Sequence, residues 1–133
     1  MAVFQAMIGN HDYTVGGSHN VKWFSCQGNP LLVPVPYDFD FCGFVNAEYA
    51  RPLPDYRQLQ QVTDRMYLGR AQNRDDLEAA LALVRSHREE LLRTVEEFEP
   101  LSRGSRRHLV SYLEQFLDRA TAKGLSAGEV LRY

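Results

Sequence analysis

The chain has 133 residues and a formal net charge of −2, a length at which a single domain buries a moderate core. Its Lys and Arg residues fall mostly after residue 55 among a similar number of acids, so no basic patch indicates nucleic-acid binding. No apolar run is long enough to cross a membrane, and the first residues lack a signal-peptide pattern. We therefore expect a cytoplasmic chain, unless a longer precursor carries an export signal.

The first predicted element is a short helix. Its apolar face is formed by residues that recur at helical spacing, namely Val3, Phe4, Met7 and Ile8. Nothing upstream caps this helix or covers its face. We therefore expect the chain to begin inside a larger fold, with the helix docking either a missing small lobe or a second copy of the chain.

A β-hairpin is predicted after the polar loop Gly9–Asn20. Residues 21–26 and 31–35 have the composition of strands, and Gln27–Pro30 has the composition of a turn. The second strand contains prolines, which lack an amide donor, so we expect it at an edge of the sheet. The hairpin then delivers the chain to a second polar loop around residues 37–40.

The segment from residue 41 to residue 69 has no regular periodicity. Residues 41–54 are rich in Gly, Asn, Tyr and Pro, and we expect an ordered loop there. Residues 56–69 are compatible with a short helix that ends near Gly69. Cys26 and Cys42 lack the spacing of a redox or metal motif, so we expect two reduced thiols.

Two long amphipathic helices are predicted in the remaining sequence. Acids at residues 75 and 76 suit the start of the first helix, whose apolar stripe Arg88 interrupts. The stripe consists of Leu77, Leu81, Val84, Leu91, Val95 and Phe98. Pro100 separates this helix from a second one over residues 102–123, and a last short helix is expected over residues 126–131. The two long helices are expected to form an antiparallel helical hairpin.

The predicted fold class is therefore α+β, in a single domain over residues 1–133. It consists of a short N-terminal helix, one β-hairpin with a polar two-loop site, and a C-terminal antiparallel helical hairpin. Residues 1–55 carry the site, and residues 56–133 are mostly helical.

An acidic site is predicted at the two loops that flank the hairpin. Residues 1–55 contain only Lys22 and Arg51 as cations, against the carboxylates of Asp12, Asp38, Asp40, Glu48 and Asp55. Carboxylates that cluster without Lys or Arg favour a bound cation. The hairpin is expected to bring the loop containing Asp12 and Asn20 close to the loop containing Asp38 and Asp40.

The order of these residues suits phosphoryl transfer. That reaction needs a carboxylate to orient or deprotonate the attacking hydroxyl, an amide oxygen on a metal, and a carboxylate between metal and phosphates. Asp12, Asn20 and Asp38 supply this set in this order. The segments MIGNHDYTVGGSHNVK and VPYDFDFCGFVNAEYARP also resemble uncharacterised bacterial proteins with a G-N-x-D, H-N and V-P-Y-D-F-D series. Those proteins in turn resemble the carboxy-terminal lobe of HipA-like, CotH-like and phosphoinositide-kinase-like atypical kinases.

The resemblance covers about residues 7–52 and implies roles by position. Asp12 would be the catalytic carboxylate, Asn20 and Asp38 would bind a Mg²⁺ or Mn²⁺ ion together with ATP, and Asp40 is a second candidate for the metal. The interval between Asp12 and Asn20 is longer than in those kinases, and no Gly-rich phosphate loop or strand lysine precedes it. The resemblance therefore implies one lobe of a larger kinase-like fold, weak or inactive alone.

Two other classes of function stay open from the residues. A metal-dependent hydrolase would use Asp12, Asp38 and Asp40 to hold a cation that activates water. A non-catalytic interaction module or truncated remnant would use the acidic loops only as structure. A zinc or iron site formed by His11 and His19 together with the acids is an alternative, although the spacing of the two histidines matches no strong signature.

Overall fold

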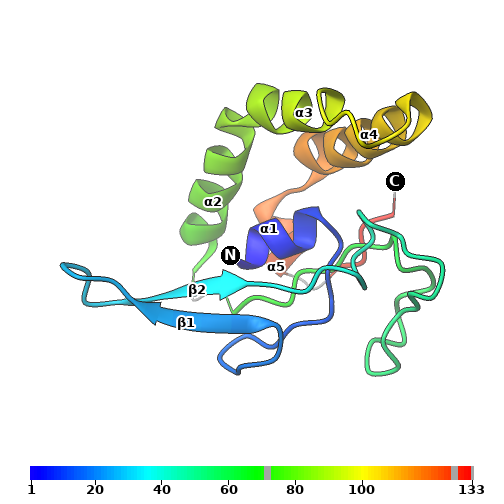
Figure 1. The fold of residues 1–133 in the computed structure, drawn as a ribbon. Helices are drawn as coiled ribbons and strands as arrows, with labels where there is room; N and C mark the ends of the chain where they lie inside the picture. Colours follow the sequence, from blue (N-terminus) through cyan, green and yellow to red (C-terminus); the bar gives the residue numbers. More distant parts are fainter. Residues whose placement is uncertain (71–72, 127–128, 133) are drawn as a thin grey trace.

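The protein has a mixed α+β architecture, which confirms the predicted fold class. The structure is a computed structural model that describes residues 1–70, 73–126 and 129–132. A helical body carries one β-hairpin that projects from it (Figure 1). The helices are α1 (Ala2–Met7), α2 (Arg74–Ser86), α3 (Arg88–Glu96), α4 (Arg103–Arg119) and α5 (Ala122–Ser126), and the strands are β1 (Val21–Ser25) and β2 (Leu32–Pro36).

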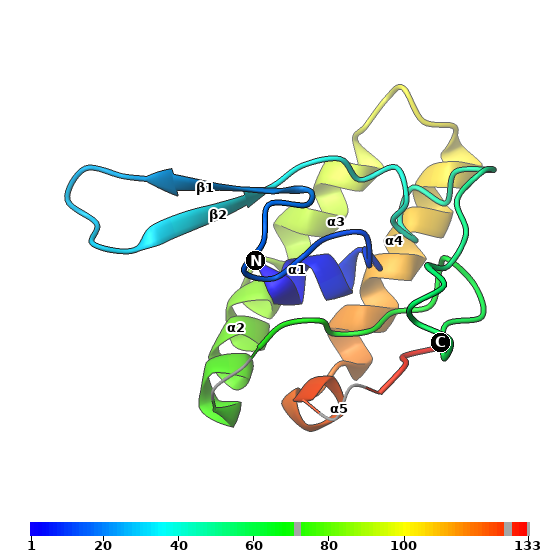
Figure 2. The same cartoon turned by 90° about the horizontal axis from the view of Figure 1, so that it is seen from below.

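The hydrophobic core lies where α1 packs against α2 and α4, with α5 packed against α2 (Figure 2). Leu81, Phe116 and Leu125 are almost completely buried there. The expectation that α1 exposes its apolar face was wrong, because Val3 and its neighbours on that face belong to this core. Phe4 alone is partly exposed, and its ring meets Phe39 edge-on with centroids 6.2 Å apart. An uncovered apolar face was the reason to expect that a small lobe or a second copy docks on this helix, and the structure removes that reason.

The hairpin agrees with its prediction to within one residue at each strand. β1 and β2 are antiparallel, with Val21 opposite Pro36 and Ser25 opposite Leu32. Both strands are edges of this two-stranded sheet, so β2 has the edge position that its prolines predict. Much of the hairpin's apolar surface faces solvent, and the exposed large side chains are Trp23, Phe24, Leu31, Leu32, Val35 and Tyr37.

The first long helix is broken at His87, so the prediction of one continuous helix was wrong. Asn73 caps α2, and its Oδ1 accepts the amide of Asp76 at 2.8 Å. At the other end the Ser86 hydroxyl donates to the Leu83 carbonyl at 2.7 Å, a local bond that bends helices. The break lets α2 pack on α1 and α5, while α3 packs on α4. α3 and α4 form the helix pair expected here, joined by residues 97–102.

The second long helix ends at Arg119, earlier than predicted. Ala120 is extended, and the Arg85 guanidinium donates to its carbonyl and, at 2.9 Å, to the Leu117 carbonyl. These bonds satisfy carbonyls that the last helical turn leaves unpaired. Ser126 is the last residue of α5, and residues 129–131 are not helical. The remainder of the helix predicted over residues 126–131 falls on residues 127 and 128, which lie outside the described part of the chain.

The segment over residues 56–69 forms turns, and the short helix considered for it is not formed. The Asp64 carboxylate instead holds the chain by accepting the Gln60 amide at 2.7 Å. Arg65 then pairs with Leu131 in an isolated antiparallel bridge. This bridge ties the end of the chain to the middle of the sequence.

Candidate functional site

The predicted site residues lie in two loops that leave the hairpin at the same end (Figures 1 and 2). Asp12 is in the first loop, and the Asn10 side chain accepts its amide at 2.9 Å. The carboxylate of Asp12 is about one-fifth exposed and lies 2.7 Å from Nε2 of His19. The Asn20 amide nitrogen donates to the other Asp12 carboxylate oxygen at 3.0 Å and to the Asp12 carbonyl at 2.8 Å. Asp12 is therefore fixed in place by several polar contacts.

Asn20 links the first loop to the second. It is buried and has a positive φ of 53°, a conformation that Asn adopts more readily than most residues. Its carbonyl accepts the amide of Tyr37 at 3.1 Å, which extends the hairpin pairing by one residue pair. Both side-chain hydrogen bonds of Asn20 use Nδ2. The amide oxygen is therefore the atom suited to contact a cation.

Asp38 follows Tyr37 directly, and like Asn20 it has a positive φ, here 59°. A hydrogen bond and the negative charge of Asp40 raise the pKa of Asp38 above its usual value, and the charge of Asp12 adds to this rise. Asp40 also accepts the Tyr49 hydroxyl at 3.0 Å, and this bond raises the pKa of Tyr49. The folded chain thus brings the two acidic loops within electrostatic reach of each other.

This arrangement suits a cation that arrives with its own ligands better than a metal held by protein alone. Asp12, Asn20 and Asp38 offer oxygen atoms, which Mg²⁺ and Mn²⁺ prefer. In the part of the chain that the structure describes, no three His, Cys, Asp or Glu side chains are placed to hold a metal ion. A dedicated three-ligand metal centre, including the zinc or iron site considered for His11 and His19, is therefore not seen among the described residues.

His11 is buried, whereas its sequence context suggested a metal ligand. It is 4% exposed, packs near the Tyr56 ring, and its Nε2 has no hydrogen-bond partner within the described ranges. Burial lowers the pKa of His11 to about 4, against a weak opposite effect of the Asp64 charge. The imidazole is therefore neutral near pH 7 and acts as a packed side chain.

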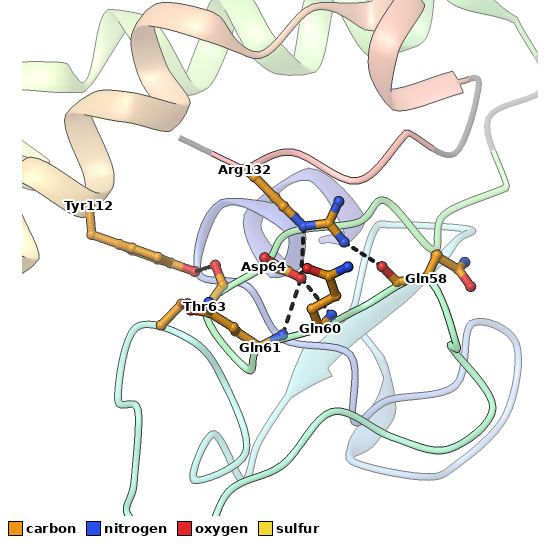
Figure 3. Close-up of polar contacts among 7 residues, drawn as sticks. All are labelled: Gln58, Gln60, Gln61, Thr63, Asp64, Tyr112 and Arg132. Atoms are coloured by element: carbon orange, nitrogen blue, oxygen red, sulfur yellow. Dashed lines mark hydrogen bonds and ion pairs between the residues drawn. The ribbon is translucent and has the colours of Figure 1, made fainter.

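A second polar cluster, around Asp64 and Arg65, was not predicted from the sequence. Asp64 is buried and forms an ion pair with Arg132 at 3.2 Å (Figure 3). Its neighbour Arg65 is 1% exposed, donates to the Met7 carbonyl at 3.0 Å and to the Tyr112 carbonyl, and stacks on the Tyr112 ring. The sequence feature that could have predicted this cluster is the adjacent pair of opposite charges between the apolar residues at positions 62 and 66.

A comparison with family models, curated proteins and solved structures finds no match to this chain. None of the helices in the described ranges combines the length and the apolar character that a membrane span needs.

Proposed function

We propose that this chain is the carboxy-terminal lobe of a kinase-like phosphotransferase that uses Mg²⁺ or Mn²⁺ together with ATP. The observation that supports this proposal most is the fixed Asp12 carboxylate, held by the Asn20 amide at the base of the hairpin, the same end at which the second strand delivers Asp38. A base, an amide oxygen and a metal-binding carboxylate are the protein groups that phosphoryl transfer requires.

In this proposal each side chain has one role. Asp12 orients the acceptor hydroxyl and takes up its proton, and the contact with His19 fixes one oxygen of the carboxylate. Asn20 and Asp38 would hold the metal through oxygen atoms, and the Asp40 carboxylate, which lies close enough to raise the pKa of Asp38, is the second candidate ligand. A metal held there would neutralise charge on the phosphates and align them for transfer.

No three-ligand group is found among the described residues, and this favours the phosphotransferase over the hydrolase. Mg²⁺ is commonly held by one or two carboxylates plus the phosphates of its substrate. A hydrolase that binds its metal without nucleotide needs a fuller set of protein ligands. The carboxylates around Asp12 and Asp38 match the smaller set of protein ligands, which suits a metal that binds together with phosphates.

The proposal assigns the Gly-rich loop and the phosphate-binding lysine of the active enzyme to a part outside these 133 residues. Weak or absent activity is accordingly expected from this chain alone. An interaction module is the second candidate, because several large apolar side chains are exposed on the hairpin, among them Trp23, Phe24 and Leu32.

Thermal unfolding with Mg²⁺ or Mn²⁺ and ATP, added singly and together, tests the proposal. A ligand at one hundred times its dissociation constant stabilises the folded form by about 2.7 kcal/mol, so binding raises the melting temperature. We expect a rise that needs both metal and ATP. Asp38→Asn should abolish this rise, and Asn tolerates the positive φ at this position.

Asp55→Asn is the matched control, since Asp55 is an exposed acid in a different loop, and it should respond as the unmodified chain does. A rise with metal alone would favour the hydrolase. No rise under any condition would contradict both metal-dependent functions and leave the interaction module.

A further inference from the structure

The hairpin carries an uncharged, apolar surface that the helical body leaves open. β1, β2 and their turn project from the body, and none of the described helices covers them (Figures 1 and 2). No Asp, Glu, Lys, Arg or His occurs between Trp23 and Tyr37. The exposed large apolar side chains of this stretch are Trp23, Phe24, Leu31, Leu32, Val35 and Tyr37. Exposed apolar surfaces of this kind mark sites of contact with another protein or with a membrane.

The exposed apolar side chains lie on both faces of the two-stranded sheet. Side chains alternate between the faces along each strand, and residues that pair across the strands share a face. In the observed register Trp23 and Leu32 lie on one face, whereas Phe24 and Val35 lie on the other. All four are at least 40% exposed. A flat protein surface would cover one of these faces only, whereas a lipid layer surrounds an inserted hairpin on both.

The prolines of β2 lower the cost of moving this hairpin out of water. The Tyr37 amide donates to the Asn20 carbonyl at 3.1 Å, and hydrogen-bonded pairs alternate with non-hydrogen-bonded pairs along antiparallel strands. Pro34 and Pro36 therefore occupy non-hydrogen-bonded pairs, in which the backbone nitrogen faces the free edge of β2. Because proline has no N–H, this edge lacks two donors that would otherwise lose their water.

The polar groups of the hairpin favour the headgroup region of a lipid layer over its hydrocarbon centre. β1 keeps the amides of Trp23 and Ser25 on its own free edge, and such donors need water or another partner. The Trp23 indole N–H points back to the first loop, where it donates to the Gly17 carbonyl at 2.9 Å. Lys22 Nζ lies 5.3 Å from the centroid of the Tyr37 ring, at the same base of the hairpin. Trp, Tyr and Lys side chains are typical of the boundary between lipid and water.

The charges beside the hairpin select the kind of lipid. Asp12, Asp38 and Asp40 lie in the loops at its base, and their carboxylates repel an anionic membrane surface. We propose that the hairpin inserts into the headgroup region of a lipid layer with zwitterionic headgroups, with Phe24 and Leu32 among its apolar anchors.

Trp23 is the one tryptophan of the chain, so its fluorescence reports directly on the hairpin. The test is a titration of the full chain with phosphatidylcholine vesicles, in which the emission of Trp23 and the fraction of protein that sediments with the vesicles are measured. We expect a saturable blue shift and co-sedimentation, both preserved at high salt because the contact is apolar. Addition of phosphatidylglycerol, an anionic lipid, to the vesicles should weaken binding.

The double variant Phe24→Ser/Leu32→Ser removes one apolar side chain from each face and should weaken binding at least about tenfold. The matched control is Phe98→Ser/Leu83→Ser, which makes the same changes on the helical body at side chains that are 51% and 62% exposed. It should bind as the unmodified chain does. The melting temperature of each variant verifies its fold before the titration.

Absence of binding to phosphatidylcholine vesicles would overturn the proposal, as would equal affinity in the Phe24→Ser/Leu32→Ser variant. Binding that requires phosphatidylglycerol would overturn the assigned kind of lipid. Sedimentation velocity without lipid tests the alternative occupant. A dimer that the Phe24→Ser/Leu32→Ser substitutions abolish, in a chain that ignores vesicles, would show that a second copy covers the hairpin instead.

Discussion

Phe116 on α4 is completely buried in the helical body, whereas Phe24 on β1 is 49% exposed on the hairpin. The body surrounds its apolar side chains with α1, α2, α4 and α5, while none of the described helices covers the projecting strands (Figure 1). An isolated two-stranded hairpin is marginally stable in water. The site loops at its base therefore depend on contacts such as those of Asn20 with Asp12, and the body supplies most of the free energy of unfolding.

The largest expected effect comes from the Phe116→Ala variant. Removal of a fully buried phenyl ring leaves a cavity, and the free energy of unfolding should fall by about 3 to 5 kcal/mol. Phe24→Ala removes the same atoms from the exposed hairpin and should cost less than about 1 kcal/mol. Chemical denaturation measures both values. Equal losses would mean that the hairpin is packed as firmly as the body.

The next largest effect is expected on acidification. It depends on the buried imidazole of His11, in the loop that joins the body to the hairpin. The pKa of His11 is lowered to about 4 in the folded chain, so between about pH 6.5 and pH 4 the unfolded chain binds a proton that the folded chain does not. Stability is fully present above this window and falls by up to about 3 kcal/mol as the pH decreases through it.

Denaturation of the unmodified chain and of His11→Asn over this pH range isolates the effect. The unmodified chain should lose more stability on acidification than the variant. His108→Asn makes the same change at an exposed histidine on α4 and serves as the matched control. Parallel profiles for the unmodified chain and His11→Asn would show that this imidazole titrates normally.

Two glycines with positive φ sharpen the comparison of body and hairpin. Gly9 has φ +65° and Gly28 has φ +82°, so alanine is strained at both positions. A Cβ at Gly9 would also overlap the Tyr112 hydroxyl, which donates to the Thr63 carbonyl at 3.1 Å, whereas the hairpin turn at Gly28 has open space. We expect losses of about 2 to 4 kcal/mol for Gly9→Ala and about 1 kcal/mol for Gly28→Ala. Similar melting temperatures for the two variants would contradict this.

The smallest effect is expected at Asp38, which is exposed. Asp40, by hydrogen bond and charge, raises the pKa of Asp38, so its contribution to stability is present at acid pH and is lost as the pH rises through the raised pKa. Asp38→Asn should therefore flatten the pH dependence and leave the melting temperature at neutral pH unchanged or slightly higher, without added metal. A clear decrease at neutral pH would indicate that the carboxylate has a structural partner.

The hairpin and the order of the site residues were predictable because their signals are local. Strand composition, the turn at Gln27–Pro30 and the prolines depend on neighbouring residues only. The proximity of the two acidic loops followed from one hairpin between them, and the Asn20 contacts place Asp12 at its base. Which ligand these groups bind stays a prediction.

The helix boundaries were less predictable, because contacts between distant residues decide them. The end of α4 depends on Arg85, which reaches carbonyls more than thirty residues further along the chain. The apolar periodicity across His87 is continuous in the sequence, but α2 and α3 pack against different partners. Periodicity records which face is apolar and carries no information about which element covers it.

The sequence by itself determined the α+β class, the hairpin and the positions of its acidic loops, since hydrophobic periodicity and turn chemistry act over a few residues. Only the tertiary structure decided that α1 is covered, that His11 is buried and neutral, and that Asp64 meets Arg132. The physical reason is that burial and ion pairing depend on the partners that folding brings together, here residues 68 positions apart.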